Sequence, residues 1–291
     1  MMVEKNLFLE FFIDIKNVKP IIKWAGGKRQ ILPYLIENLP NNWDRYFEPF
    51  VGGGALLIEL YKKNLIKSAV ISDINIDIYN LYLSIKEKPK ELIEKIKTLP
   101  FRNNSKDYYE ARRLFNENKI INVPDLNRAS LFIYLNRHCY NGLYRLNSKG
   151  EFNAPFGRYN NPSMPTEENI WELNKLFKKI IILNDDFEIV VINARKGDFV
   201  YFDPPYMPLS KTSNFTDYTS EGFDENGQIR LFNVCKKLNS LGVNFMLSNS
   251  NSEFIRNLYK DFNIISIPAK RNINSKASLR GEIEELIIKN Y

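Results

Sequence analysis

Four consecutive residues in the second half of the chain combine a carboxylate, a rigid backbone and an aromatic ring. Phe199–Phe202 is an uninterrupted apolar run that predicts a buried strand, and it ends at Asp203, Pro204, Pro205 and Tyr206. Two prolines fix φ and remove two backbone donors, so the Asp203 carboxylate and the Pro204 carbonyl become rigid acceptors at the carboxyl edge of a sheet. Tyr206 adds a flat face. This set suits a planar amine whose two N–H groups point at the acceptors while its ring stacks on the tyrosine.

The chemistry expected of such a set is attack by the amino nitrogen on an electrophile. Holding both amino hydrogens out of conjugation exposes the nitrogen lone pair, which helps a poor nucleophile. The alternative is that the prolines simply end a strand. His138 is the sole histidine, and Cys139 and Cys235 have no second thiol or histidine at metal-ligand spacing. We therefore expect no histidine-based triad, no disulfide framework and no metal site.

A glycine-rich turn earlier in the chain is suited to binding a nucleoside. Arg45–Phe50 is interpreted as a strand that runs into Gly52–Gly54, where the absence of a Cβ lets the backbone approach a ligand closely. Asp73 ends the next short strand, where a carboxylate commonly receives both ribose hydroxyls. The same residues are compatible with a tight structural turn and a helix-capping aspartate. Leu57 stands where a third glycine would complete the dinucleotide fingerprint, which disfavours a nicotinamide cofactor.

Alternating strands and helices must position these residues. This alternation predicts an α/β fold with a doubly wound, parallel sheet. The predicted helices are Lys28–Leu39, Ala55–Lys63, Asp77–Lys86, Phe223–Leu241 and Glu253–Lys260. The predicted strands are Arg45–Phe50, Ala69–Ser72, Ile180–Leu183, Phe199–Phe202, Val243–Ser248, Asn263–Ile267 and Ile283–Lys289.

An insertion interrupts this alternation. From about Pro89 to Phe177 the chain shows charged helical segments and then Tyr140–Tyr159, where aromatic and basic residues surround the turn Asn147–Gly150. We interpret this part as an inserted domain that ends in a hairpin. The expected organisation is an N-terminal extension over residues 1–19, a catalytic domain over 20–88 and 179–291, and an inserted target-recognition domain over 89–178.

Composition restricts the class of protein and of partner. Apolar residues make up 44% of the 291 residues and charged residues 26%, which excludes a disordered or collagen-like chain. The 41 Lys and Arg against 34 Asp and Glu give a net charge of +7, which favours a polyanionic partner. The early apolar stretch Leu7–Ile15 is interrupted by Glu10 and Asp14, so we expect no membrane span and a cytoplasmic protein.

Taken together, these separated motifs resemble those of the Dam-type DNA adenine methyltransferases, from about Pro20 to Tyr291. The resemblance implies a Rossmann-like methyltransferase sheet with an inserted helical and β-hairpin DNA-recognition domain. It also implies a site-specific, adenine-specific DNA methyltransferase that takes its methyl group from S-adenosyl-L-methionine, as in restriction-modification systems. Members with this hairpin commonly modify the adenine in GATC. The partner expected is double-stranded DNA, bound by a monomer or weak dimer.

The resemblance assigns roles to single residues. Lys23–Lys28 resembles the amino-terminal cofactor motif, although by itself it is compatible with a loop around a buried Trp. Asn184–Phe187 resembles the element that contacts the adenine of the cofactor, and Asp186 is preferred to Asp185 as the polar contact. The catalytic motif is Asp203, Pro204, Pro205 and Tyr206. The implied cofactor contacts are Trp24, Lys28, Glu48, Gly52, Gly54, Asp73, Asp186, Phe187 and Asp203.

Asn136–Arg145 and Gly150–Tyr159 resemble the DNA-recognition hairpin of the family. Arg145 is suited to a bidentate contact with a guanine edge, Leu143 and Pro155 to contact with a thymine methyl group, and Tyr140 and Asn141 to filling the gap left by an extruded base. For any one of these residues the alternative is a solvated surface position. The complete set of expected DNA contacts is Arg137, Tyr140, Asn141, Leu143, Arg145, Pro155, Arg158, Tyr159, Lys270 and Arg271.

Two loops complete the expected site. Pro208–Thr212 with Phe215–Tyr218 is interpreted as a lid over a flipped base, or else as a surface connection. The basic residues Lys270, Arg271, Lys276 and Arg280 suit DNA phosphates or a solvated loop. The competing functions are the same chemistry at another DNA site, methylation of RNA adenine or of a protein glutamine amide, and a noncatalytic DNA-binding regulator that retains the fold.

Overall fold

A seven-stranded sheet organises the chain. The computed structural model describes residues 18–24, 26, 28, 30–208, 223–270 and 282–291. The strand order is β3-β2-β1-β4-β5-β7-β6. The first five strands in this order are mutually parallel, and β7 runs antiparallel between β5 and β6. The strands are β1 (Tyr46–Glu48), β2 (Ala69–Ser72), β3 (Ile181–Leu183), β4 (Phe199–Phe202), β5 (Asn244–Ser250), β6 (Asn263–Lys270) and β7 (Glu282–Lys289).

The strand order reverses between β1 and β4, which lie side by side with Tyr46 opposite Phe199. From β1 the chain continues to β2 and then β3 on one side, whereas β4 leads to β5 on the other side. In open α/β sheets, ligands bind beyond the carboxyl ends of the strands at such a reversal. The fold therefore places the end of β1 and the end of β4 at the expected ligand site.

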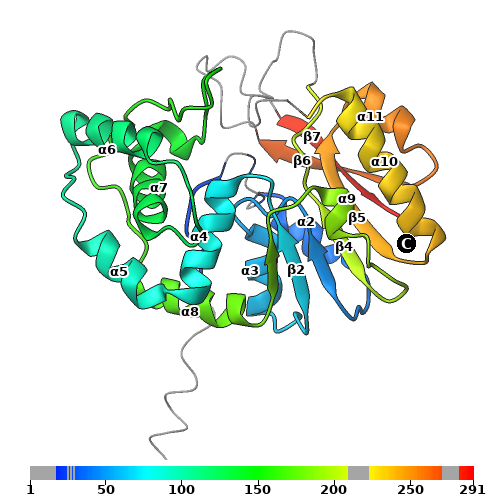
Figure 1. Cartoon of the computed structure of the whole chain (residues 1–291). Coiled ribbons are helices and arrows are strands. Elements are labelled where there is room, and N and C mark those ends of the chain that lie inside the picture. The colour runs from blue at the N-terminus through cyan, green and yellow to red at the C-terminus, as the bar shows by residue number, and fades with distance from the viewer. Residues whose placement is uncertain (1–17, 25, 27, 29, 209–222, 271–281) are drawn as a thin grey trace, which may run out of the picture.

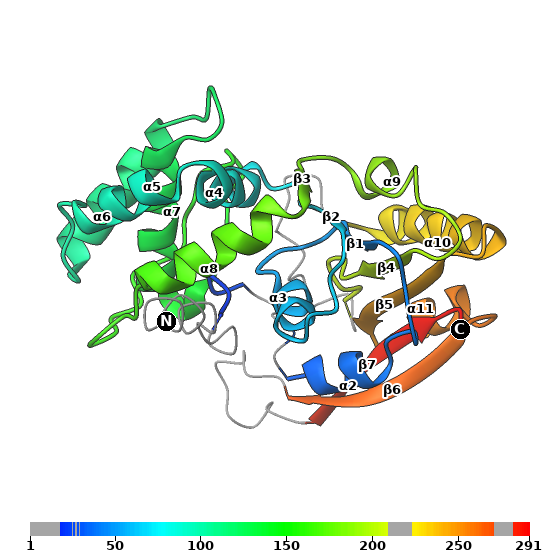
Figure 2. The same ribbon diagram turned by 90° about the horizontal axis from the view of Figure 1, so that it is seen from below.

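Alternation along the strands divides the core between the two faces of the sheet. In β4, Phe199 and Tyr201 pack into one buried cluster, while Val200 and Phe202 pack into the other. Helices α2 (Leu32–Glu37) and α3 (Ala55–Lys62) cover the first face. Figure 2 shows α9 (Phe187–Val190), α10 (Glu225–Ser240) and α11 (Glu253–Leu258) on the opposite face. This arrangement confirms the predicted α/β class and the doubly wound sheet.

A group of helices lies to one side of the sheet (Figure 1). It consists of α4 (Ile76–Glu87), α5 (Pro89–Lys97), α6 (Ser105–Glu117), α7 (Leu126–His138) and α8 (Glu167–Lys178). Side chains cap several of these helices: Asn75 accepts from Asp77 N at the start of α4, and Thr166 accepts from Asn169 N at the start of α8. Helix α4 contacts α7 and α8 and also strand β3, so it joins this group to the sheet.

The predicted hairpin is present in an irregular form. After the short helix η3 (Tyr140–Gly142), the chain turns at Asn147–Gly150 and returns, with single antiparallel bridges between Cys139 and Phe156 and between Leu146 and Phe152. Regular strand pairing is interrupted because Asn141 and Gly142 both adopt left-handed conformations, with φ of 54° and 64°. The expected strands are therefore reduced to two bridges.

Several element predictions differ from the structure in their bounds, and the strand predicted over Arg45–Phe50 is reduced to β1 (Tyr46–Glu48). The first predicted helix begins at Leu32 and not at Lys28, because residues from Lys28 form a turn and Pro33 suits only the first turn of a helix. Strand β6 extends to Lys270, beyond the predicted end at Ile267. Helix α9 was not predicted. Among the described residues, no helix is both long enough and apolar enough to cross a membrane.

Candidate functional site

Asp203 forms the centre of the site at the end of β4. The Lys28 Nζ atom lies 2.8 Å from its Oδ1 atom, with side-chain exposures of 7% for Lys28 and 21% for Asp203. Burial raises the pKa of Asp203 to about 6, although the neighbouring Lys28 charge opposes this rise. The Asp203 carboxylate is therefore predominantly ionised at pH 7, where it accepts hydrogen bonds.

Tyr206 is fixed beside Asp203 at two points. The Lys28 ammonium lies over its ring, 4.2 Å from the ring centroid, in a cation–π contact. The Tyr206 hydroxyl donates a 2.8 Å hydrogen bond to Glu285 Oε2 on β7. Tyr206, the Lys28 ammonium and the Glu285 carboxylate thus come together from three separate parts of the chain.

Two buried amide side chains hold the backbone around Tyr206, and sequence reasoning missed both. Gln228 Nε2 donates to the Pro205 carbonyl at 2.9 Å, and Asn249 Oδ1 accepts from Met207 N at 3.2 Å. Asn249 Nδ2 also donates to Gln228 Oε1 at 3.0 Å. The only sequence signal was the polar run Ser248–Ser250 at the end of an otherwise apolar strand. These contacts keep the proline segment in one position.

The glycine turn lies beyond β1 and has left-handed backbone. Gly52 and Gly54 have φ of 47° and 68°. A Cβ on Gly52 would lie 2.7 Å from Cδ1 of Trp24, so the indole ring packs directly on the turn. The Asp73 carboxylate accepts hydrogen bonds from Gly52 N and Asn75 N, each at 2.9 Å. Asp73 thus connects the ends of β1 and β2, and burial raises its pKa to about 6.

Glu48, the last residue of β1, is buried next to this turn. Its Oε2 atom accepts a 2.9 Å hydrogen bond from the Tyr46 hydroxyl. Burial, reinforced by the negative charges of Asp203 and Asp73, raises the pKa of Glu48 to about 8. At neutral pH this carboxyl group is largely protonated and can donate a hydrogen bond, unlike the ionised Asp203.

Asp186 and Phe187 lie at the start of α9, adjoining the end of β2. Asn184 Nδ2 donates to the Asp73 carbonyl at 2.7 Å, which brings this segment to the glycine turn. The Asp186 side chain caps α9 and pairs with Arg230 at 2.9 Å. Phe187 is buried and stacks on Phe50, with ring centroids 5.4 Å apart. The helix-capping role considered as the alternative for Asp73 belongs instead to Asn75 at the start of α4, whereas Asp186 caps α9.

The expected DNA contacts divide into outward and inward residues. Tyr140 is 50% exposed. Arg145 is exposed and donates from Nε to Asn153 Oδ1 at 2.6 Å, and Tyr159 accepts from Asn141 N at 2.8 Å. Arg137 instead donates to the Ile21 carbonyl at 2.5 Å, inside the protein. Asn141, Pro155 and Arg158 are exposed, whereas Leu143 is partly buried.

Several expected positions lie outside the described residues. They are Arg271, Lys276, Arg280, residues 209–212 and residues 215–218, and the description of Lys270 is limited to its place at the end of β6. Within the described ranges, no group of three or more His, Cys, Asp or Glu side chains could hold a metal ion.

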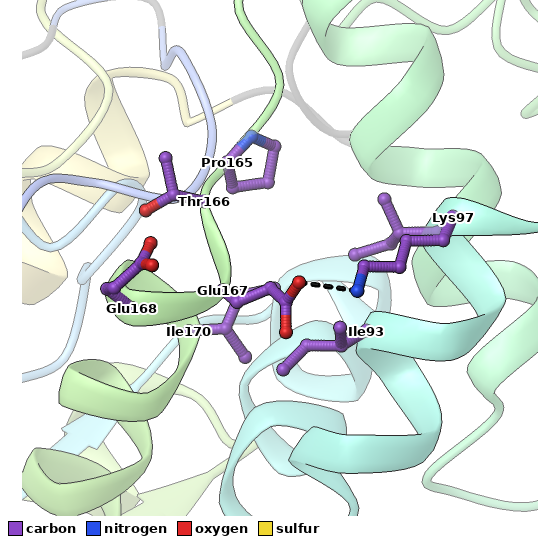
Figure 3. A pocket seen from close by; sticks show the side chains of 8 residues that line it. Ile93, Lys97, Pro165, Thr166, Glu167, Glu168 and Ile170 are labelled. Atoms are coloured by element: carbon purple, nitrogen blue, oxygen red, sulfur yellow. Dashed lines mark ion pairs between the residues drawn. The ribbon is translucent and has the colours of Figure 1, made fainter.

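A pocket of about 310 Å³ lies elsewhere, between α5 and the start of α8 (Figure 3). An ion pair between Lys97 and Glu167 crosses it. None of the expected site residues lines this pocket. Its lining residues are Ile93, Ile96, Lys97, Pro165, Thr166, Glu167, Glu168 and Ile170.

Comparison with known proteins extends over nearly the whole chain. The family model for D12 class N6 adenine-specific DNA methyltransferase matches residues 24–273. The chain is 46% identical over 278 residues to the type II methyltransferase M1.LlaDCHI of Lactococcus lactis subsp. cremoris, covering 94% of this chain and 96% of that protein. It is 48% identical over 289 residues to the type II methyltransferase M.MjaIII of Methanocaldococcus jannaschii, covering 94% and 100%. It is 32% identical over 275 residues to the DNA adenine methylase of Escherichia coli K12, covering 94% and 95%.

Proposed function

Because the chain belongs to the D12 class of N6 adenine-specific DNA methyltransferases, we propose that it methylates a flipped adenine of duplex DNA, within GATC, using S-adenosyl-L-methionine. The chain is thus an enzyme that acts on DNA adenine. The observation that best supports the details is the assembly of Asp203, Lys28 and Tyr206 at the reversal point of the sheet. This assembly offers an acceptor and a ring face to one planar amine.

Adenine binding requires an exchange of partners at Asp203. The Lys28 ammonium lies on Oδ1 of Asp203 and over the ring of Tyr206, so it occupies the position proposed for the adenine amino group. We infer that the entering amino group replaces Lys28 as donor to Asp203 and donates its second hydrogen to the Pro204 carbonyl. The adenine ring then stacks on Tyr206. Flipping costs a few kcal/mol, which these contacts offset.

The residues at the glycine turn fit a nucleoside donor. Gly52 has no Cβ at the point where the Trp24 ring meets the turn. At the carboxyl ends of β1 and β2, the neutral Glu48 offers a hydrogen-bond donor and the ionised Asp73 offers an acceptor. Glu48, Asp73 and the start of α9 would hold the donor, and Phe50 and Phe187 supply an apolar face nearby. When bound, S-adenosyl-L-methionine supplies a methyl group on a sulfonium sulfur.

The transfer needs no covalent enzyme intermediate. The adenine nitrogen forms a bond to the methyl carbon as the carbon–sulfur bond breaks, and the electron pair of that bond stays on sulfur. The methylated amino group then loses one proton to water. Asp203 acts as a hydrogen-bond acceptor that positions the amino group, and its pKa of about 6 suits this role at neutral pH.

We assign DNA recognition to the part proposed as residues 89–178. The exposed Arg145, preoriented by Asn153, is suited to a guanine edge in the major groove. Tyr140 and Asn141 are exposed in η3 at the start of the hairpin, where a side chain can enter the space vacated by the flipped base. Arg137, which is bound to the Ile21 carbonyl, supports the hairpin from inside.

Methyl transfer to two matched duplexes tests this function. One duplex contains GATC, and the other has these four bases permuted. With methyl-labelled S-adenosyl-L-methionine, we expect label in N6-methyladenine from the GATC duplex only. Label in both duplexes would retain the chemistry and contradict the GATC assignment. No label in DNA, with transfer to RNA or to a protein amide, would contradict the proposal.

A further inference from the structure

Tyr144 is the inward-facing residue of the hairpin, between Leu143 and the exposed Arg145. Its side chain is 5% exposed, and its ring packs among those of Phe132 and Phe152. The proposed base contacts at Arg145 therefore lie one residue away from a side chain fixed in the core. A displacement of this strand by DNA would be transmitted to the Tyr144 ring, because close-packed interiors have little room to absorb it.

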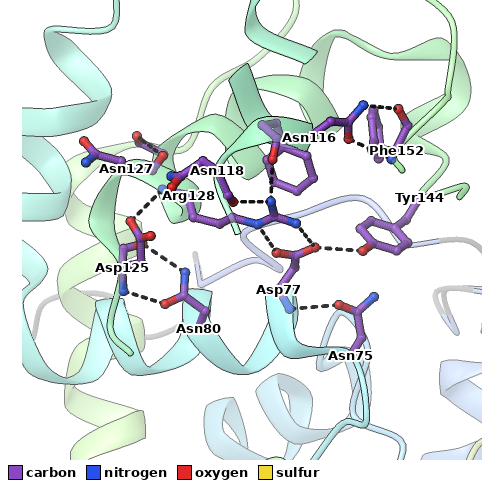
Figure 4. A network of polar contacts seen from close by, with 12 residues as sticks. Asn75, Asp77, Asn80, Asn116, Asn118, Asp125, Asn127, Arg128, Tyr144 and Phe152 are labelled. Carbon is purple, nitrogen blue, oxygen red and sulfur yellow. Dashed lines mark hydrogen bonds and ion pairs between the residues drawn. The ribbon is translucent and has the colours of Figure 1, made fainter. Parts of the chain in front are cut away.

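The hydroxyl group of Tyr144 reaches the helix that leads away from the cofactor edge (Figure 4). It donates a 2.7 Å hydrogen bond to Oδ2 of Asp77, which is 1% exposed. Arg128 binds both oxygens of the same carboxylate, at 2.6 and 3.1 Å, so the Asp77 charge is neutralised within the protein. Asp77 lies in the first turn of α4.

From Asp77 a continuous series of hydrogen bonds leads to the glycine turn. Asn75 Oδ1 accepts from Asp77 N, and Asn75 N donates to Asp73 Oδ1, each at 2.9 Å. The other Asp73 oxygen accepts from Gly52 N at 2.9 Å. The hydroxyl of Tyr144 is therefore connected to the proposed donor site through the capping turn of α4.

The ring of Tyr144 reaches the same turn by a second route. Its centroid lies 5.5 Å from that of Trp24, whose indole ring packs on Gly52 and whose Cβ lies beside Gly53. Tyr144 is thus connected to Gly52 in two ways: through hydrogen bonds that end at Asp73, and through the ring of Trp24. Among the residues expected to bind DNA or the donor, Tyr144 was absent, because it reads from sequence as one more aromatic residue in a hairpin.

We propose that Tyr144 is a positioning residue that couples DNA binding at the hairpin to methyl-donor binding at the glycine turn. This proposal rests on the proposed function of both sites. By thermodynamic linkage, DNA must then tighten donor binding by the same factor by which the donor tightens DNA binding. Tyr144 transmits this coupling through its hydroxyl on Asp77 and its ring on Trp24.

The test compares two tyrosine-to-phenylalanine variants. Tyr144→Phe removes the hydroxyl and retains the ring, while Arg128 continues to neutralise Asp77. The matched control is Tyr108→Phe. Tyr108 on α6 is also fully buried, and its hydroxyl donates at 2.8 Å to the hairpin carbonyl of Ala154. It therefore supports the hairpin without belonging to the connection between Tyr144 and Gly52.

The measured quantity is the Kd of S-adenosyl-L-homocysteine, which lacks the transferable methyl group, without and with a saturating GATC duplex. For the wild type we expect a ratio of these constants of about 5 or more. In Tyr144→Phe we expect the ratio to fall below half of the wild-type value, because a charge-assisted hydrogen bond is lost. In Tyr108→Phe it should remain within about 2-fold of the wild-type value. In Tyr144→Phe, the ratio of the DNA Kd values measured without and with S-adenosyl-L-homocysteine should change by the same factor.

Three results would overturn the coupling: a wild-type ratio of 1, an unchanged ratio in Tyr144→Phe, or an equal loss in both variants. The last result would show a merely structural role for the hydroxyl. A wild-type enzyme that methylates DNA yet has a ratio of 1 overturns the coupling and leaves the proposed function intact. A wild-type chain that neither binds S-adenosyl-L-homocysteine nor transfers methyl groups overturns both the coupling and the proposed function.

Discussion

At the scale of single residues, burial sets the protonation of the carboxyl groups in the site. Glu48 and Asp203 lie at the ends of adjacent strands, yet the pKa of Glu48 is raised to about 8 and that of Asp203 to about 6. The difference follows from their partners, because Lys28 stabilises the charge of Asp203 whereas Glu48 has the Tyr46 hydroxyl. Two neighbouring acids thus have opposite hydrogen-bonding roles at neutral pH.

The pH dependence of methyl transfer should report the ionisation of Asp203. Because its pKa is raised to about 6 before adenine enters and its acceptor form is the ionised one, kcat/KM for DNA should fall as the pH is lowered through about 6. In Lys28→Met the opposing cation is lost, so the acid limb of the kcat/KM profile should move to higher pH. The measurement is kcat/KM for DNA against pH at saturating donor.

Lys23→Met serves as the control for this profile. Lys23 lies in the same segment, but its ammonium lies over the Tyr159 ring and not beside Asp203. The acid limb of the Lys23→Met profile should therefore coincide with that of the wild-type profile. An acid limb that stays in place in Lys28→Met, or moves to lower pH, would contradict the assignment of this limb to Asp203.

At the scale of the elements, the turn between β1 and α3 is held in one conformation at the proposed donor site. Gly52 combines a left-handed φ of 47° with close contact to the Trp24 ring. A side chain at this position is disfavoured by the backbone and by the ring together. The turn is therefore more sensitive to substitution than the left-handed turn at Gly150, where a Cβ would meet open space.

Gly52→Ala should weaken donor binding by at least 10-fold and lower the free energy of unfolding by about 1–3 kcal/mol. Gly150→Ala provides the matched control, because Gly150 has a left-handed φ of 73° but open space where a Cβ would lie. It should lower stability with little effect on the donor Kd. Calorimetric titration and thermal unfolding of both variants measure these effects. Equal donor Kd values in the two variants would refute a specific role for Gly52.

The elements also show what the sequence could and could not predict. Strands β2 and β4 were predicted with their observed bounds, because short apolar runs ending in aspartate are local signals. Helix α9 was missed because Phe187–Val190 is one turn long, too short for helical periodicity to appear. Gln228 and Asn249 were missed because their contacts join α10 to the end of β5, and no local pattern reports such a pairing.

The same limit applies to the candidate site. The motif residues Lys28, Asp203 and Tyr206 were named from sequence, and the structure brings them together. Their arrangement, with the lysine in the place proposed for the amine, required the tertiary structure. The inward direction of Arg137 also required it, because a basic residue in the last turn of a helix reads as exposed until its partners are known.

At the scale of the whole molecule, net charge governs the encounter with DNA. The chain has a net charge of +7, and the expected phosphate contacts are lysines and arginines. The logarithm of the association constant should fall by about 0.9 per neutralised phosphate for each tenfold rise in salt concentration. Binding measured by fluorescence anisotropy at several salt concentrations gives this slope. A slope near zero would contradict a binding mode based on basic side chains.

The central claim is that Asp203 positions the adenine amino group for transfer, and its most direct test is single-turnover methylation of a GATC duplex by Asp203→Ala. Wild-type and variant enzyme are compared at saturating labelled S-adenosyl-L-methionine, with DNA affinity measured in parallel. We predict that the variant loses transfer by at least 100-fold while its DNA Kd stays within about 3-fold of the wild type, because one positioned group is removed from the reaction and none from the hairpin. Near-normal transfer by Asp203→Ala would contradict the account.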